Sequence, residues 1–332
     1  MPELRKDYII DRYVIIANER GKRPDEFKKD RNEAKNNLQN QEKTIEELNK
    51  EKKECYFCPG NENLTPLELD RFPNFEKWQI RLFPNKFAAV KQEGNPILKT
   101  DNHFFTFSDA FGYHEVLVET PDHEKTLADL SIEELKNVFI MLKKRFSDLS
   151  NKSNIKYVSI FKNSGEKAGC SIQHSHCQII AYNIVPEIIK KKEFFSNQHN
   201  KCPYCYIIDI EKNSLRKCFE NNNFLAFTPY ASRFPFEIWI LPKKHYSNLA
   251  EIRDNEFYDL SEIMKKIFIK LKELNADYNF YFQYSPNPEL KDKMHFHIEI
   301  CPRLSIQAGF ELSTDTYINT ISPEDAASFY RS

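Results

Sequence analysis

The chain has 332 residues, which corresponds to about two domains of ordinary size. Its 48 basic and 49 acidic side chains leave a net charge of -1, which excludes a strong long-range attraction to nucleic acid or to an anionic membrane. Apolar residues make up 40% of the chain, and none of its apolar runs approaches the roughly 18 residues of a membrane span. Charged residues between Glu3 and Arg12 also interrupt any signal peptide, so we expect a cytoplasmic protein.

Residues 28–53 form a segment of strongly biased composition, in which charged and amide side chains predominate. Such a segment cannot bury a stable apolar face, so we predict a solvated helix or a mobile insertion. The whole chain contains only 7 Gly, and neither a G-x-G-x-x-G motif nor a Walker-type loop is present. The two common glycine-rich modes of binding nucleotide phosphates are therefore excluded.

Runs of β-branched and aromatic residues predict strands in both halves of the chain. The expected strands are Trp78–Phe83, Tyr113–Glu119, Lys156–Lys162 and Cys177–Tyr182, followed later by Phe224–Phe227, Phe236–Leu241, Asn279–Tyr284 and Met294–Cys301. A capping box at Ser131 and Glu134 predicts the start of one helix, and Asn255–Leu274 is expected to form a second. This order predicts an α+β protein whose two halves each contain mostly antiparallel sheet and one main helix.

The chemically distinctive residues recur in the same order in both halves. Each half has a C-x-x-C pair, a lone histidine and an H-x-H pair: Cys55/Cys58, His123 and His174/His176 in the first, and Cys202/Cys205, His245 and His295/His297 in the second. The lone histidine precedes the H-x-H pair by 51 residues in the first half and by 50 in the second. We therefore predict a duplicated fold, with one repeat in residues 1–195 and the other in 196–332, joined by a shared sheet or half-barrel.

Paired cysteines and histidines with this spacing favour zinc, which takes four sulfur or nitrogen ligands in a tetrahedron. We predict two zinc ions per chain, held by Cys55, Cys58, His123 and His174 and by Cys202, Cys205, His245 and His295. Buried thiols without a metal are the alternative for either cysteine pair.

Strand alternation would place His174, His176 and Gln178 on one face, with successive side chains about 6.7 Å apart. One zinc ion could not readily take both histidines, so one of them should remain free for chemistry. For His114 the sequence leaves the role open.

The segment from Asn163 to Gln178, NSGEKAGCSIQHSHCQ, resembles the active-site stretch of galactose-1-phosphate uridylyltransferases. That family is a branch of the histidine triad superfamily, and its usual pattern is G-[CA]-S-x-x-H-P-H-x-Q. Three further segments resemble family motifs in the same order: RGKRP at 20–24, FPNKFAA at 83–89 and AGFE at 308–311. The resemblance implies two histidine-triad-like repeats, with the active site in the N-terminal one.

The resemblance also implies a ping-pong reaction. In that reaction His176 attacks the α-phosphorus of UDP-glucose, glucose 1-phosphate leaves, and galactose 1-phosphate takes the uridylyl group. A neutral imidazole is a suitable nucleophile near neutral pH, and the Gln178 amide can donate to a phosphate oxygen. By the same resemblance, substrate contacts are expected from Arg20, Arg23, Asn85, Asn163, Ser171, Glu311 and Tyr317.

Ser175 stands where the family pattern has proline, a form associated with relatives that include a plant enzyme acting on ADP-glucose with phosphate as the acceptor. An ADP-glucose phosphorylase-like adenylyltransferase or a nucleotide-ester hydrolase is therefore the alternative function. A zinc-stabilised binding module without catalysis is a third hypothesis, which the H-x-H followed by Gln178 disfavours.

The second H-x-H is followed by Glu299 in place of the glutamine. A carboxylate there would repel a substrate phosphate, so we expect the second site to be catalytically silent. Family members commonly form homodimers in which C-terminal residues of one subunit complete the sugar pocket of the other. We therefore expect a homodimer in which Glu311 and Tyr317 serve the neighbouring active site.

Overall fold

The structure is a computed structural model that describes residues 2–18, 53–73 and 77–332. Its centre is a ten-stranded sheet in which every pair of neighbouring strands is antiparallel. The strands of the first half are β3 (Asp70–Phe72), β4 (Ile80–Pro84), β7 (Gly112–Val118), β8 (Tyr157–Ser164) and β9 (His176–Tyr182). Those of the second half are β10 (Lys217–Glu220), β11 (Phe224–Phe227), β12 (Ile238–Pro242), β13 (Tyr278–Gln283) and β14 (His297–Pro302).

The strand order reveals the duplication. From the junction between β8 and β13, the order is β8-β9-β7-β4-β3 on one side and β13-β14-β12-β11-β10 on the other. Corresponding strands therefore occupy corresponding places, related by a pseudo-two-fold axis at the β8–β13 pair. This confirms the predicted α+β fold of two repeats with a shared sheet. The division between residues 195 and 196 remains a prediction.

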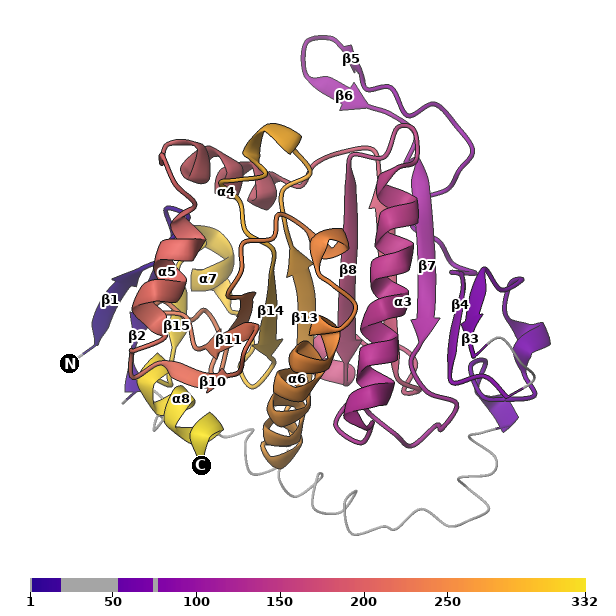
Figure 1. The fold of residues 1–332 in the computed structure, drawn as a ribbon. Helices are drawn as coiled ribbons and strands as arrows, with labels where there is room; N and C mark the ends of the chain where they lie inside the picture. Colours follow the sequence, from indigo (N-terminus) through magenta and orange to yellow (C-terminus); the bar gives the residue numbers. More distant parts are fainter. Residues whose placement is uncertain (1, 19–52, 74–76) are drawn as a thin grey trace.

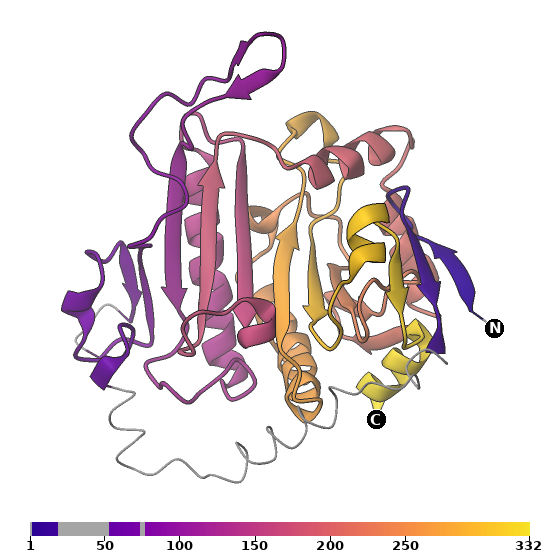
Figure 2. The same ribbon diagram turned by 180° about the vertical axis from the view of Figure 1, so that it is seen from behind.

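Two long helices, α3 (Ile132–Ser150) and α6 (Glu256–Glu273), lie side by side on one face of the sheet (Figure 1). The predicted capping box is present, since Ser131 Oγ accepts from the Glu134 amide and the Glu134 carboxylate accepts from the Ser131 amide. Apolar residues of both helices form the main core against the sheet, and Phe139 of α3 stacks on Phe257 of α6. These helices leave the opposite face of the central strands open to other segments (Figure 2).

Strand alternation in β9 decides which residues reach that opposite face. Cys177, Ile179 and Ala181 are fully buried in the core beneath the helices. Since neighbouring residues of a strand point to opposite faces, His176 and Gln178 point away from α3 and α6. The sheet face seen in Figure 2 therefore carries His176 and Gln178, the residues predicted to be catalytic.

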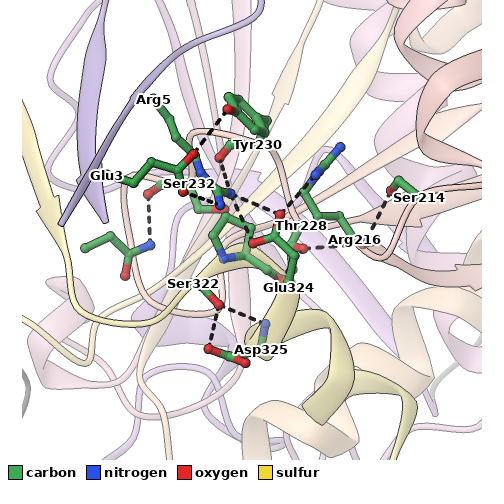
Figure 3. A network of polar contacts seen from close by, with 12 residues as sticks. Glu3, Arg5, Ser214, Arg216, Thr228, Tyr230, Ser232, Ser322, Glu324 and Asp325 are labelled. Atoms are coloured by element: carbon green, nitrogen blue, oxygen red, sulfur yellow. Dashed lines mark hydrogen bonds and ion pairs between the residues drawn. The ribbon is translucent and has the colours of Figure 1, made fainter. Parts of the chain in front are cut away.

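The two ends of the chain meet beside the second half of the sheet. Strands β1 (Glu3–Lys6), β2 (Tyr13–Ile16) and β15 (Tyr317–Asn319) form a separate three-stranded sheet, and α8 (Pro323–Arg331) contacts β10. Figure 3 shows the polar network between them, in which Arg5 and Arg216 both donate to Glu324 over 3.0 Å. Burial alone would raise the pKa of Glu324, but a hydrogen bond from its own amide and the two arginines hold this pKa below its ordinary value. The network thus ties the N-terminal strands to the C-terminal helix.

The sequence did not predict β1, β2, β3, β10, β15 or α8, and it did not predict the remaining elements. They are the hairpin of β5 (Lys99–Asp101) and β6 (Phe105–Phe107), which projects from the sheet (Figure 1), the helices α4 (Glu187–Asn197), α5 (Pro203–Glu211) and α7 (Gly309–Thr314), and the short 3-10 helices Glu62–Leu64, Glu166–Ala168, Leu249–Glu251 and Pro288–Leu290. Across the described ranges, no helix has both the length and the apolar character needed to cross a bilayer.

Several predicted boundaries are wrong by a few residues. The strand expected from Phe236 begins at Ile238, because Phe236 has a φ of +61° and places its ring against Phe329 and Tyr330. The strand expected from Met294 begins at His297, because the ring of His295 turns toward Cys205. The predicted insertion at 28–53 lies, except for Lys53, outside the described residues.

Candidate active site and metal-ligand groups

The first predicted ligand set comes together in a buried cluster. Cys58 Sγ lies 3.3 Å from His123 Nδ1 and 3.5 Å from His174 Nδ1, and Cys55 Sγ lies 3.6 Å from His174 Nδ1. All four ligand atoms lie within 4.8 Å of one another. This group could therefore hold one metal ion.

The chemistry of the first group fits zinc. With zinc–sulfur bonds of about 2.3 Å and zinc–nitrogen bonds of about 2.05 Å, a tetrahedron separates sulfur from nitrogen by about 3.5 Å. The sulfur–nitrogen distances in the cluster agree with this value. In addition, His174 Nε2 donates to the Thr120 carbonyl over 2.7 Å, so His174 Nδ1 presents its lone pair to the thiols.

The second group repeats this arrangement closer to the surface. Cys205 Sγ lies 3.4 Å from His245 Nδ1 and 3.5 Å from His295 Nδ1, and the four ligand atoms, including Cys202 Sγ, lie within 4.8 Å. Both histidines donate Nε2–H to backbone carbonyls, those of Lys291 and of Pro242 at the end of β12. Its contacts with Cys202 and then with the two histidines hold the pKa of Cys205 well below its usual range, which favours the thiolate that binds metal.

The expected placement of His174 on the same strand face as His176 is wrong, and His295 likewise lies outside the strand predicted to contain it. β9 begins at His176 and β14 begins at His297, so His174 and His295 precede their strands. The reason is that each first imidazole turns toward its cysteines and donates to a backbone carbonyl. The separation of roles is kept, since His174 faces the thiols and His176 occupies the strand.

The side chain of His176 is held in one tautomer. His176 Nδ1 lies 2.8 Å from the carbonyl oxygen of His174, which can only accept, so Nδ1 carries the hydrogen and Nε2 keeps its lone pair. Burial, and then the positive charge of Lys162, lower the pKa of His176 and favour the neutral ring. The ring of Phe57 packs against it edge-on at 5.3 Å between centroids. His176 therefore has the form that a nitrogen nucleophile requires.

Gln178 is oriented by His114, for which the sequence left the role open. The Ala89 amide donates to His114 Nδ1 over 3.0 Å, so His114 Nε2 carries the hydrogen and donates to Gln178 Oε1 over 2.9 Å. This leaves the amide nitrogen of Gln178 as its donor end. Asn85 Nδ2 lies 3.1 Å from His114 Nε2, so the predicted Asn85 and Gln178 meet at this histidine. The pairing of β7 with β9 places His114 diagonally across from Gln178, and the sequence carries no signal for this register.

The second H-x-H is enclosed by the side chains around it. His297 Nδ1 donates to the His295 carbonyl as in the first half, but Lys192 Nζ lies 3.4 Å from His297 Nε2 and donates to Glu299 over 2.5 Å. Arg233 donates to the other Glu299 oxygen over 2.6 Å. Lys192 and Arg233 thus compensate the charge of the Glu299 carboxylate, so repulsion of a phosphate by Glu299 is not the reason to expect a catalytically inactive second site. The reason is that these side chains enclose His297.

The other expected substrate contacts are dispersed. Asn163 accepts from Asn279 in the neighbouring strand, and Ser171 is exposed in the loop before β9. Glu311 accepts from the Ala308 amide at the start of α7, and Tyr317 packs against Phe234. Both α7 and β15 lie beside β2, at the far end of the sheet from β7 (Figure 1). Arg20 and Arg23 lie outside the described residues.

Comparisons with known proteins agree with this architecture. Residues 2–186 match the family described as galactose-1-phosphate uridyl transferase, N-terminal domain, and residues 116–328 match a domain family of unknown function. ADP-glucose phosphorylase of Arabidopsis thaliana is 32% identical, with 99% of this chain and 92% of that protein covered. Galactose-1-phosphate uridylyltransferase of Thermotoga maritima is 29% identical, with 98% and 97% covered.

Solved structures give the same result. A crystal structure of an ADP-glucose phosphorylase from Arabidopsis thaliana with bound ADP-glucose superposes with a TM-score of 0.82 at 29% identity, and 100% of this chain and 99% of that chain are covered. A uridylyltransferase structure superposes with a TM-score of 0.72 at 25% identity, with 100% and 97% covered. From its sequence, its duplicated sheet and these relatives, the chain belongs to the galactose-1-phosphate uridyl transferase family of enzymes.

Proposed function

We propose that the protein is a nucleotidyltransferase that acts on nucleoside-diphosphate sugars through a nucleotidyl-histidine intermediate. The observation that carries this proposal is the pair formed by His176 and Gln178 on one face of β9. His176 keeps the lone pair of Nε2, and His114 holds the Gln178 amide with its donor end available. A nucleophile and an adjacent donor for a charged oxygen are the two groups that phosphoryl chemistry requires.

The reaction proceeds in two displacements at one phosphorus atom. His176 Nε2 attacks the α-phosphorus, a phosphorus–nitrogen bond forms, and the bond to the bridging oxygen breaks to release the sugar 1-phosphate. A phosphate oxygen of the acceptor then attacks the same phosphorus and breaks the phosphorus–nitrogen bond, which restores the neutral imidazole. Gln178 donates to a non-bridging oxygen in both steps. The attacking phosphate oxygens carry no proton at neutral pH, so no separate base is needed.

Uridylyl transfer from UDP-glucose to a hexose 1-phosphate such as galactose 1-phosphate is our leading proposal for the substrates. It is supported by the family match and by relatives named galactose-1-phosphate uridylyltransferase that are 27–30% identical over most of the chain. A role in galactose metabolism follows from this assignment.

Transfer of an adenylyl group from ADP-glucose to inorganic phosphate is the second candidate. It is supported by the Arabidopsis relative named ADP-glucose phosphorylase, which resembles this chain over nearly its whole length in sequence and in structure. The two candidates share the His176 chemistry and differ in the base and the acceptor.

Labelled UDP-glucose and ADP-glucose, incubated separately with the protein, distinguish the candidates. The donor that leaves labelled nucleotide on the protein identifies the base, and the acceptor that then removes the label, galactose 1-phosphate or inorganic phosphate, identifies the second substrate. If neither donor leaves any label and neither is consumed, the proposed function is wrong.

The two cysteine–histidine groups would hold zinc, with Cys55, Cys58, His123 and His174 in the first half and Cys202, Cys205, His245 and His295 in the second. When bound, zinc would stabilise the fold of its half, because metal binding to such ligands is also folding free energy. His174 would then fix the segment that leads to His176, while neither metal group contacts the substrate.

We also propose that the protein is a cytoplasmic homodimer with two composite active sites. α7 and β15, which carry Glu311 and Tyr317, lie far along the sheet from β7 (Figure 1), so a neighbouring subunit would bring these residues to His176 more readily than their own chain. Mixing inactive His176→Ala chains with inactive Glu311→Ala chains should restore part of the activity through hybrid dimers. A fully active monomer in sedimentation would contradict this arrangement.

A further inference from the structure

A buried ion pair lies directly beneath the H-x-H segment of the first half. Lys162 of β8 and Glu119, which follows β7, place Nζ and Oε2 2.6 Å apart, and their side chains are 2% and 0% exposed. Removing two charges from water costs free energy, and a buried pair is often no more stable than apolar residues of similar volume. The pair therefore calls for an explanation other than stability.

The ion pair is bonded to the residues around the proposed nucleophile. Lys162 Nζ donates to Ser175 Oγ over 2.9 Å and to the His176 carbonyl over 3.0 Å, and Ser175 Oγ donates to Glu119 Oε2 over 2.5 Å. The Glu119 amide also donates to the Ser175 carbonyl over 3.2 Å. All three hydrogens of the Lys162 ammonium are thus used. The backbone on both sides of the His176 side chain is fixed from this network.

The second half shows that the fold itself does not need this network. Gln178 pairs with Phe161 in β8, and Glu299 pairs with Tyr281 in β13, so Lys162 corresponds to the next residue of β13, Phe282. Ser175 corresponds to Phe296 in the second H-x-H. The rings of Phe282 and Phe296 pack edge-to-face with 5.5 Å between their centroids. The end of β12, at Pro242, supplies no charge where the first half has Glu119. The same architecture therefore packs with apolar residues in the half whose histidine is enclosed.

We propose that Lys162, Glu119 and Ser175 are positioning residues that hold His176 for attack on phosphorus. This inference rests on the proposed function of His176. The His176 ring is held through the carbonyl of His174, the residue before Ser175, and the strand carbonyl of His176 is held by Lys162. Release of this segment would let the ring turn or move, and a displacement of about 1 Å can cost about 100-fold in rate.

Two variants test the proposal. Ser175→Ala removes the hydroxyl that joins the ion pair to the H-x-H segment. Glu119→Leu/Lys162→Met/Ser175→Ala removes the ion pair together with this hydroxyl and leaves no unpaired charge. Ser261→Ala is the matched control, since it deletes a buried hydroxyl in α6 that donates to the Phe257 carbonyl. The rate of nucleotidyl-enzyme formation should fall about 10- to 100-fold in both test variants and remain unchanged in the control.

Three further readouts separate positioning from a structural role. KM for the nucleotide sugar should change less than about two-fold and zinc content should stay at the wild-type level, because neither the substrate contacts nor the metal ligands are altered. Ser175→Thr, which keeps the hydroxyl, should recover most of the rate. If Ser175→Ala and Ser175→Thr form the adduct at the wild-type rate, the proposal is overturned.

A direct measurement on His176 keeps this test separate from the proposed function. Nitrogen NMR of isotope-labelled histidine reports which ring nitrogen carries the hydrogen, without any substrate. The wild type should show the Nδ1–H form for His176, and Ser175→Ala should show a mixture of tautomers. If the wild type forms no adduct, the proposed function fails, and unchanged His176 tautomers in Ser175→Ala would still overturn the positioning role.

Discussion

The contact between His114 and Gln178 gives a prediction whose size follows from the structure. His114 holds Gln178 Oε1 at 2.9 Å and thereby aims the amide nitrogen. In His114→Phe the ring volume is nearly kept but the donor is lost. The Gln178 side chain then regains its rotamer freedom, which corresponds to about 1.5–2 kcal/mol for glutamine. The rate of nucleotidyl transfer should therefore fall about 10- to 30-fold.

Loss of the whole amide should be more severe. Removal of one donor to a developing oxyanion typically costs about 100- to 1,000-fold in rate, and we expect this for Gln178→Ala. If His114 acts through Gln178, the double variant His114→Phe/Gln178→Ala should be little slower than Gln178→Ala alone. His199→Phe, which alters an exposed histidine of the loop after α4, is the control.

Single-turnover formation of the nucleotidyl-enzyme, measured by rapid quenching and mass spectrometry, is the appropriate assay. The melting temperature of each variant should be measured beside it, because the Ala89 amide loses its acceptor in His114→Phe. Losses that simply multiply in the double variant, or an unchanged rate in His114→Phe, would refute the role assigned to His114.

Three other predictions concern the metal groups and the fold. Cys202→Ser/Cys205→Ser should remove one equivalent of zinc in elemental analysis and lower the melting temperature while adduct formation persists; an unchanged zinc content would contradict the second metal group. Glu324→Gln should cost about 1 kcal/mol of unfolding free energy at neutral pH. Because the folded-state pKa of Glu324 is lowered below 4.5, this difference should disappear as the pH falls through that pKa in denaturant titrations; a pH-independent difference would be inconsistent with the ion pairs. Gly112→Ala should destabilise the protein by more than about 2 kcal/mol, since a Cβ there would lie 2.0 Å from the Ala181 carbonyl; a wild-type melting curve would exclude this.

The duplication and both ligand groups could be predicted because their residue types are rare and their spacing repeats. The ligands of each half are brought together in space as the sequence indicates. The core strands and the two long helices were also predictable, because hydrophobic periodicity and the Ser131 capping box are local signals. Short strands at the ends of the chain, such as β1 and β15, carry too few residues for such a signal.

Contacts between distant residues could not be predicted from one sequence. Lys162 and Glu119 are 43 residues apart and meet only because β7, β8 and β9 pair in one register. The contact of His114 with Gln178 depends on the same pairing. The position of His174 was mispredicted for a different reason, because the preference of its ring for the thiols overrides strand alternation.

The central claim is that His176 forms a covalent bond to the nucleotide, and mass spectrometry of the intact protein after incubation with nucleotide sugar tests it most directly. The wild type should gain the mass of one nucleoside monophosphate residue, and fragmentation should place this group on the peptide that contains His176. His176→Ala should gain none and lose several orders of magnitude in turnover, because its nucleophile is absent. An adduct that persists in His176→Ala, or one that maps to a different residue, would contradict the account.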